Sequence, residues 1–141
     1  MYPALKNDEG QVLAWVKQNL ALSNLKRGKS AEAAELYQSA YDILRKLQED
    51  PCTEVGADTG EGLVAALLGA GRPDEAEQRA IEIGQWRGEN CGPESEANAD
   101  ALALLARVAF ARGRRDEGRS LREQEKGIRA LLKERAGQAA P

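Results

Sequence analysis

The side chains that could carry chemistry in this sequence are first of all three acids expected on neighbouring helices. Asp58, Glu61 and Asp100 would present their carboxylates near one face. They could be solvated acids, which the positive end of a helix dipole favours. They could also recognise a basic peptide, or hold a divalent cation, for which carboxylate oxygens are suitable ligands. All three interpretations stay open at the level of sequence.

A second group consists of Arg107 and Phe110, which lie three residues apart and therefore on one side of a helix. An exposed arginine and an aromatic ring beside a groove are typical interface anchors. Burial of Phe110 is the alternative. Trp15 is either a packing residue or a ligand anchor, and Trp86 is expected in the core between repeats.

The sequence contains few residues suited to catalysis or to metal binding. The sequence has no histidine, which removes the commonest general base and the commonest metal ligand. Two cysteines are too few for a structural zinc site without other ligands. The glycines between Gly56 and Gly71 do not match a phosphate-binding loop. We therefore predict no enzyme activity, no cofactor and no metal site.

Cys52 and Cys91 are expected in successive links between helix pairs, at the same edge of the molecule. Two free thiols are the favoured interpretation, and a disulfide is the alternative. The two residues are 39 positions apart rather than 42, which would put them out of register. A disulfide requires their Cα atoms to lie within about 7 Å.

The elements that must position these residues recur every 42 to 43 residues. A similar phrase ends at Gly28, Gly71 and Gly113, and Asp74 and Glu75 reappear as Asp116 and Glu117. Periods of this length mark arrays in which each unit buries its apolar face against its neighbours. The pattern indicates a binding scaffold rather than an enzyme.

Each unit is predicted to be a helix, a glycine turn and a second helix. Val12, Trp15, Val16 and Leu20 show the helical spacing in the first unit. The predicted first helices span 11–27, 54–70 and 96–112, and the predicted second helices span 30–49, 74–88 and 115–135.

The helix starts have their own signals. Ser30, Thr53 and Ser95 are expected N-caps. Pro73 suits the first turn of a helix. The residues outside the helix pairs are assigned to an N-terminal extension and a tail, 1–10 and 136–141.

The stretches Leu25–Ala33 and Leu68–Ala76 resemble the turn between the two helices of a tetratricopeptide repeat. The resemblance covers about residues 11–135, and the repeats fall at about 11–50, 53–90 and 95–135. The period exceeds the usual 34 residues and is similar to the extended variant of kinesin light chains and many bacterial regulatory proteins. The resemblance implies an all-α, right-handed solenoid of three helix pairs. The polar residues of the last helix, such as Arg122 and Glu125, predict that it is a cap.

The resemblance also implies that the first helix of each pair lines a concave face where ligands bind. The partner-binding residues expected on this face are Trp15, Gln18, Asn19, Leu22, Lys26, Asp58, Glu61, Ala65, Asp100, Arg107 and Phe110. Some members of the family bind a C-terminal carboxylate there with Lys, Arg and Asn. Gln18 and Leu22 replace the cation and the amide, so we do not predict that carboxylate site.

The net charge of −3 argues against general binding to nucleic acid. Residues 112–135 nevertheless carry nine Lys and Arg against five Asp and Glu, a net charge of +4. A solvated, ion-paired final helix explains this stretch, and a docking surface for an acidic partner is the alternative. The sequence has neither a long apolar run nor a secretion signal, which predicts a cytoplasmic protein without a membrane span.

Together these features predict a protein–protein interaction module that binds an extended or helical segment of a partner in the concave groove. Acidic and apolar lining residues favour a partner segment with basic and hydrophobic residues. The alternative is a self-association or scaffold domain of a larger regulatory protein, which would dimerise through the exposed edge of the first repeat. Nucleic-acid binding through the last helix is a third possibility, which the overall acidity opposes.

Overall fold

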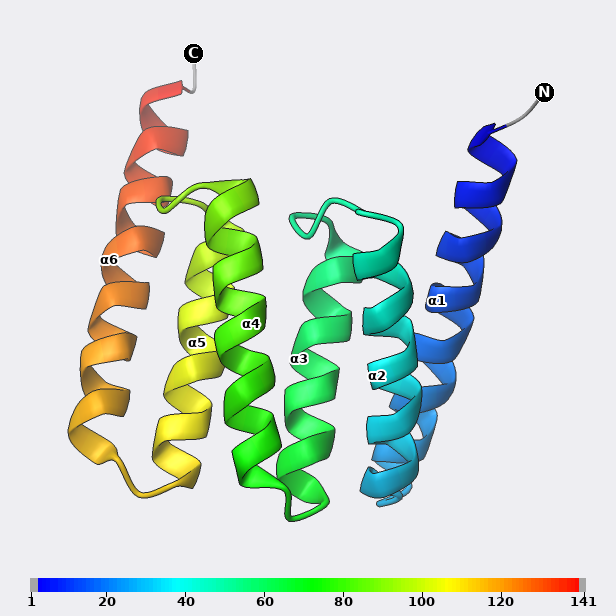
Figure 1. Ribbon diagram of the computed structural model, residues 1–141. Helices are drawn as coiled ribbons and strands as arrows, with labels where there is room; N and C mark the ends of the chain where they lie inside the picture. The colour runs from blue at the N-terminus through cyan, green and yellow to red at the C-terminus, as the bar shows by residue number, and fades with distance from the viewer. Residues whose placement is uncertain (1–2, 140–141) are drawn as a thin grey trace.

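The computed structural model describes residues 3–139, and the regular structure in this part of the chain is α-helical throughout. The helices are α1 Pro3–Lys26, α2 Ser30–Lys46, α3 Glu54–Gly69, α4 Pro73–Cys91, α5 Glu96–Ala111 and α6 Arg115–Ala139. Figure 1 shows them side by side in chain order, with α1 and α6 at the two ends of the row. This is the predicted all-α array of three helix pairs.

The two helices of a pair have different places in the array. Over the described residues, the backbone of α3 lies close to those of α1 and α5, whereas the backbones of α2, α4 and α6 do not approach one another closely. α2 and α4 meet through long side chains such as Gln38 and Arg79. The first helices therefore form the closely spaced inner side, and the second helices form the outer side. No helix within residues 3–139 combines the length and the apolar character needed to cross a bilayer.

The same glycine turn connects the two helices of each pair, as predicted. Gly28, Gly71 and Gly113 have φ values of 79°, 72° and 79°, a left-handed conformation that would strain a side chain. The residue after each glycine donates its N–H to the carbonyl oxygen five residues earlier, over 2.8 to 2.9 Å. These bonds satisfy carbonyls that the end of the first helix leaves free.

Two of the three predicted N-caps are confirmed. Thr53 and Ser95 each accept a hydrogen bond from the backbone N–H three residues on, at 3.3 and 3.1 Å. Ser30 is wrong as a cap, because it is the first residue of α2, and Lys29 before it makes no side-chain cap bond. The Ser30 side chain lies against Gly69 of α3 instead.

Small side chains allow the helices to pack closely. Ala33 and Ala76 are fully buried at matching positions of α2 and α4, and Gly118 is buried at the matching position of α6. The main core cluster extends from α1 to α5 around residues such as Leu63. Trp86 is partly buried against this cluster, in agreement with its predicted place between repeats.

The buried side of α1 is not the one marked by its large apolar residues. Ala14 and Ala21 are fully buried. The large residues Val12, Leu13, Trp15, Val16, Leu20 and Leu22 are all exposed. The physical reason is the close approach of α1 to α2, where Gly10 already lies against Leu47 and only small side chains fit.

Three helices extend beyond their predicted bounds: α1, α6 and, at the disulfide described below, α4. α1 begins at Pro3, so residues 3–10 are helical rather than an extension, and α6 continues to Ala139, into the predicted tail. Proline is suited to a first turn, since its missing N–H would have no partner there. The remainder of the two predicted segments, 1–2 and 140–141, lies outside the described residues.

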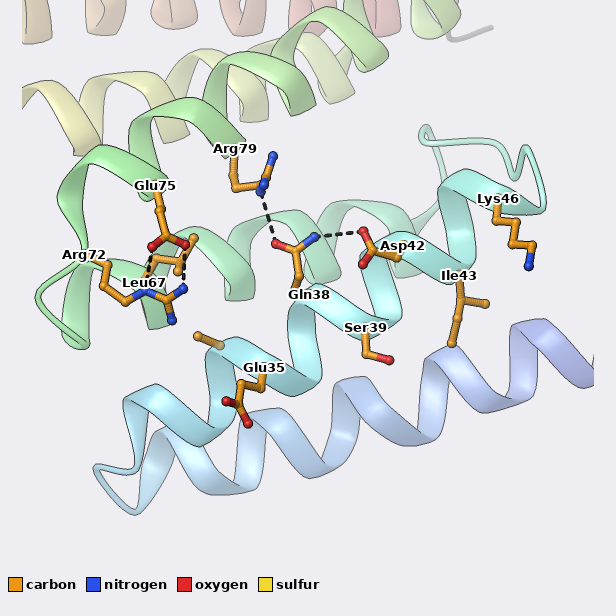
Figure 2. Close-up of a pocket in the computed structure, with 11 residues that line it drawn as sticks. Glu35, Gln38, Ser39, Asp42, Ile43, Lys46, Leu67, Arg72, Glu75 and Arg79 are labelled. Carbon is orange, nitrogen blue, oxygen red and sulfur yellow. Dashed lines mark hydrogen bonds and ion pairs between the residues drawn. The ribbon is translucent and has the colours of Figure 1, made fainter.

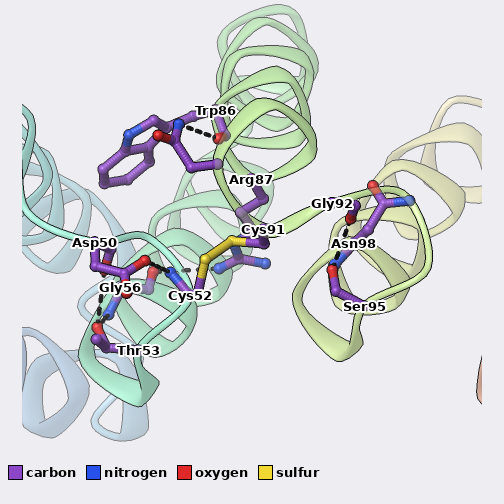
Figure 3. The surroundings of a disulfide bond; sticks show 11 residues. Asp50, Cys52, Thr53, Gly56, Trp86, Arg87, Cys91, Gly92, Ser95 and Asn98 are labelled. Carbon is purple, nitrogen blue, oxygen red and sulfur yellow. Dashed lines mark hydrogen bonds between the residues drawn. A yellow bond between two sulfur atoms is a disulfide. The ribbon is translucent and has the colours of Figure 1, made fainter. Parts of the chain in front are cut away.

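A disulfide joins Cys52 and Cys91, so the prediction of two free thiols is wrong (Figure 3). Their Cα atoms are 5.7 Å apart. α4 continues to Cys91, beyond its predicted end at 88, and this extra turn carries the sulfur back to the link that holds Cys52. Asp50 Oδ1 shapes that link by accepting the Cys52 N–H at 2.9 Å. Asp50 lies near both sulfurs, but these are bonded to each other and cannot hold a metal.

Candidate partner-binding groove

Two adjoining cavities form a groove along the first helices, which we call the inner groove. One lies between α1 and α3 and has a volume of about 400 Å³; the other lies between α3 and α5, reaches α6 and has a volume of about 410 Å³. Glu61 and Arg107 line both cavities. The other lining residues are Gln18, Leu22, Leu25, Tyr37, Asp58, Gly62 and Ala65 in the first cavity, and Asp100, Ala103, Leu104, Arg122 and Arg129 in the second.

Most of the residues expected to bind a partner come together here. Those that line the inner groove are Gln18, Leu22, Asp58, Glu61, Ala65, Asp100 and Arg107. They are brought together because each first helix turns one face inward; on α3 this face carries Asp58, Glu61 and Ala65 at helical spacing. Their role in binding stays a prediction.

The other four expected residues do not line the inner groove. Trp15, Asn19 and Lys26 are exposed on α1, Trp15 by 54%. Phe110 is 39% exposed, and its ring lies over Gly118 of α6, where an added Cβ would approach it to 2.8 Å. Phe110 therefore belongs to the contact between α5 and α6.

Tyr37 is a groove residue that sequence reasoning missed, because it comes from a second helix, α2. It is only 3% exposed. Its ring crosses α3 at Gly62, where an added Cβ would overlap it. Since glycine inside a helix costs about 1 kcal/mol relative to alanine, Gly62 was the available sequence signal of such a close approach. The other missed lining residues are Leu25, Leu104, Arg122 and Arg129.

The groove is acidic beside α3. Asp58 and Glu61 are exposed, and within the described residues neither makes an ion pair or a side-chain hydrogen bond. Burial raises the pKa of Tyr37, and the charges of these two carboxylates raise it further. The phenol is therefore held in its neutral form next to two free negative charges.

The groove is basic beside α5 and α6. Arg129 donates to Asp100 Oδ1 at 2.7 Å and to Glu125 Oε2 at 2.9 Å, and these hydrogen bonds raise the pKa of Arg129. The charge of Asp100 is thereby compensated. Arg107 is exposed and makes no ion pair with any described residue, so it supplies the free positive charge at this end.

A buried arginine supports the acidic wall from behind. Arg87 is 1% exposed, and its Nη2 donates to two carbonyl oxygens in the first turns of α3 at 3.2 and 3.0 Å (Figure 3). Gly60 leaves the space for it, since an added Cβ would lie 3.1 Å from Nη2. Burial lowers the pKa of Arg87, and the groove carboxylates act in the opposite direction. This positive charge fixes the helix that presents the acids.

A larger cavity lies elsewhere, between α2 and α4, and has a volume of about 670 Å³ (Figure 2). Several of its polar side chains are already paired with one another. Gln38 donates to Asp42 at 2.9 Å and accepts from Arg79 at 3.1 Å, and Arg72 pairs with Glu75. A ligand would have to displace these bonds, whereas the acids beside α3 in the inner groove are free to accept a cation.

The architecture is similar to that of a solved repeat domain. The tetratricopeptide repeat domain of FLU from Arabidopsis matches with a TM-score of 0.68, covering 88% of this chain and 98% of that one at 15% sequence identity. No family model matches the sequence, and no curated protein matches it either. The chain thus has the tetratricopeptide repeat fold, in which six helices pack in order as three pairs, and this fold generally serves as a protein-interaction module.

Proposed function

We propose that the protein is a non-catalytic interaction module whose inner groove binds an extended or helical segment of a protein partner. The segment carries a basic residue that meets Asp58 and Glu61, and hydrophobic residues that fill the space beside Leu22 and Ala65. An acidic group further along it faces Arg107. The period of about 42 residues also supports the extended, kinesin-light-chain-like form of the repeat as a hypothesis.

The observation that carries this proposal is a pair of exposed acids without an ion pair in a partly apolar cavity. Tyr37, Leu22 and Leu25 share this cavity with Asp58 and Glu61. Carboxylates beside apolar surface with no partner of their own suit a cationic side chain, because the pairing gains from the lower local dielectric. If Asp58 and Glu61 served only as solvated surface acids, nothing would explain why apolar residues line the same cavity.

The test is a selection of peptides from a random display library on the immobilised protein. Enriched peptides should combine Lys or Arg with hydrophobic residues, and their affinity should fall at least about tenfold in the Asp58→Lys, Glu61→Lys variant, a loss typical of an interface charge pair. The matched control is Glu35→Lys, Asp42→Lys, which changes the charge equally in the cavity between α2 and α4. Peptides that bind the first variant as well as the wild type would disprove the groove assignment.

The disulfide bears on the predicted cytoplasmic location. Disulfides persist mainly in oxidising compartments, whereas cytosolic thiols are kept reduced. A cytoplasmic protein should therefore carry Cys52 and Cys91 as thiols in the cell, although the fold brings them within bonding distance. The redox state of Cys52 and Cys91 in the cell can be measured by thiol labelling at the moment of lysis, compared with labelling after reduction. Equal labelling would show free thiols, and labelling only after reduction would show the disulfide.

A further inference from the structure

The side of α1 that faces away from α2 and α3 carries an apolar stripe that nothing in the described chain covers. Val12, Leu13, Val16 and Leu20 are 58%, 49%, 40% and 53% exposed. α1 stands at one end of the helix row, and its contacts are with α2 and α3 on its other side (Figure 1). Contiguous apolar surface of this kind on a helix marks an interaction site.

Opposite charges bound this stripe at its two ends. Glu9 precedes it and Arg27 follows it, and both are exposed. Neither forms an ion pair with another side chain of residues 9–138. Arg27 directly follows α1, and its N–H still bonds to the Ser23 carbonyl oxygen at 3.2 Å, as in a further helical residue. Glu9 and Arg27 are 18 residues apart, which is five full turns of an α-helix, so they lie on one line about 27 Å apart. Val16 and Leu20 lie between them, about 20° to either side of that line.

We propose that this surface binds a second copy of the chain, with the two α1 helices antiparallel across a two-fold axis. The axis passes between Val16 and Leu20, at the middle of the stripe. Glu9 of each copy then meets Arg27 of the other at both ends, and Val16 packs against Leu20 in the centre. Such a contact uses the same surface on both copies and closes at two chains.

The charges favour this arrangement over two others. A parallel pairing would set Glu9 against Glu9 and Arg27 against Arg27, and like charges across an interface are unfavourable. Stacking of α1 on α6 of another copy would meet a polar surface, since Arg119, Glu123 and Lys126 are exposed there. The dimer leaves the inner groove free and does not depend on the function proposed for it.

The first test is sedimentation velocity of the whole chain over a series of concentrations. The wild type should approach twice the chain mass, whereas Val16→Glu, Leu20→Glu should remain a monomer. Ile81→Glu is the control, because it places a glutamate on an apolar residue of α4 that is 44% exposed. Far-UV circular dichroism checks that all variants are folded. A wild type that stays monomeric, or a double variant that still dimerises, overturns the proposal.

The second test exchanges the charges. Glu9→Arg alone, or Arg27→Glu alone, should raise the dissociation constant at least about tenfold, because like charges then face each other at both ends. Glu9→Arg and Arg27→Glu together should restore the wild-type constant. A dimer that is insensitive to the single changes, or is not restored by the exchange, overturns the antiparallel arrangement.

Discussion

The two ends of the helix row are held by different interactions. All ion pairs among the described residues involve α4, α5, α6 or the links beside them. The α1–α2 pair packs instead through small and apolar side chains such as Ala14, Ala40 and Leu44. The exposed surface of α6 is charged, whereas the surface of α1 that faces away from α2 and α3 is apolar.

The two ends of the row therefore present surfaces of different chemistry. A charged outer face keeps a terminal helix in water, as a cap must, while an apolar one favours a partner. The two ends should also respond to different perturbations: packing at the α1 end is sensitive to side-chain volume, and ion pairs at the α6 end are sensitive to salt.

The largest effect is expected from the disulfide between the two ends. It closes a separation of 39 residues, for which the chain-entropy model gives a stabilisation of about 4 kcal/mol. Cys52→Ser, Cys91→Ser should lower the free energy of unfolding by up to that amount in urea titrations. Wild-type protein with reductant is the control and should match the variant. A loss below about 1 kcal/mol would mean that helix packing alone holds this region.

A large effect on the free energy of unfolding is also expected at the contact of α2 with α3, where there is no room for a larger side chain. Gly62→Ala places a Cβ inside the Tyr37 ring, and overpacking of this kind costs about 1–3 kcal/mol. We expect at least about 2 kcal/mol in chemical denaturation, since both partners are buried. Gly62→Ala with Tyr37→Leu should lose less than the sum of the two single changes. Strict additivity would show that the clash is relieved elsewhere.

A smaller, salt-dependent effect is expected at the α6 end. Arg129→Met removes the bonds to Asp100 and Glu125. Because the Arg129 side chain is 40% exposed, the loss should be no more than about 1 kcal/mol after allowance for solvent screening. Unfolding in about 1 M NaCl should largely remove the difference from wild type. Gly62→Ala is the control, as its cost should be unchanged by salt.

The smallest effect is expected at Gly127 on α6, and it has the opposite sign. An added Cβ there meets nothing within 4 Å, so Gly127→Ala should stabilise the protein by about 0.5–1 kcal/mol through helix propensity. The rise in melting temperature measures it. Destabilisation instead would show that glycine is required at this position, which would contradict a solvent-facing cap.

Much of the groove could be predicted, because inward residues of a helix recur at a known spacing. Asp58, Glu61 and Arg107 were placed by their position on a first helix and do line it. Trp15 was placed in the same way and does not, although Gln18 and Leu22 of the same helix do. Tyr37 was missed because it enters from a second helix.

The sequence by itself determined the parts that depend on local chemistry. Glycine turns, the caps at Thr53 and Ser95 and the order of helix pairs follow from backbone preferences within a few residues. Only the tertiary structure decided which face of α1 is buried, that Cys52 reaches Cys91, and that two free acids share a cavity with apolar residues. These features depend on distances between helices, which packing sets and no local pattern contains.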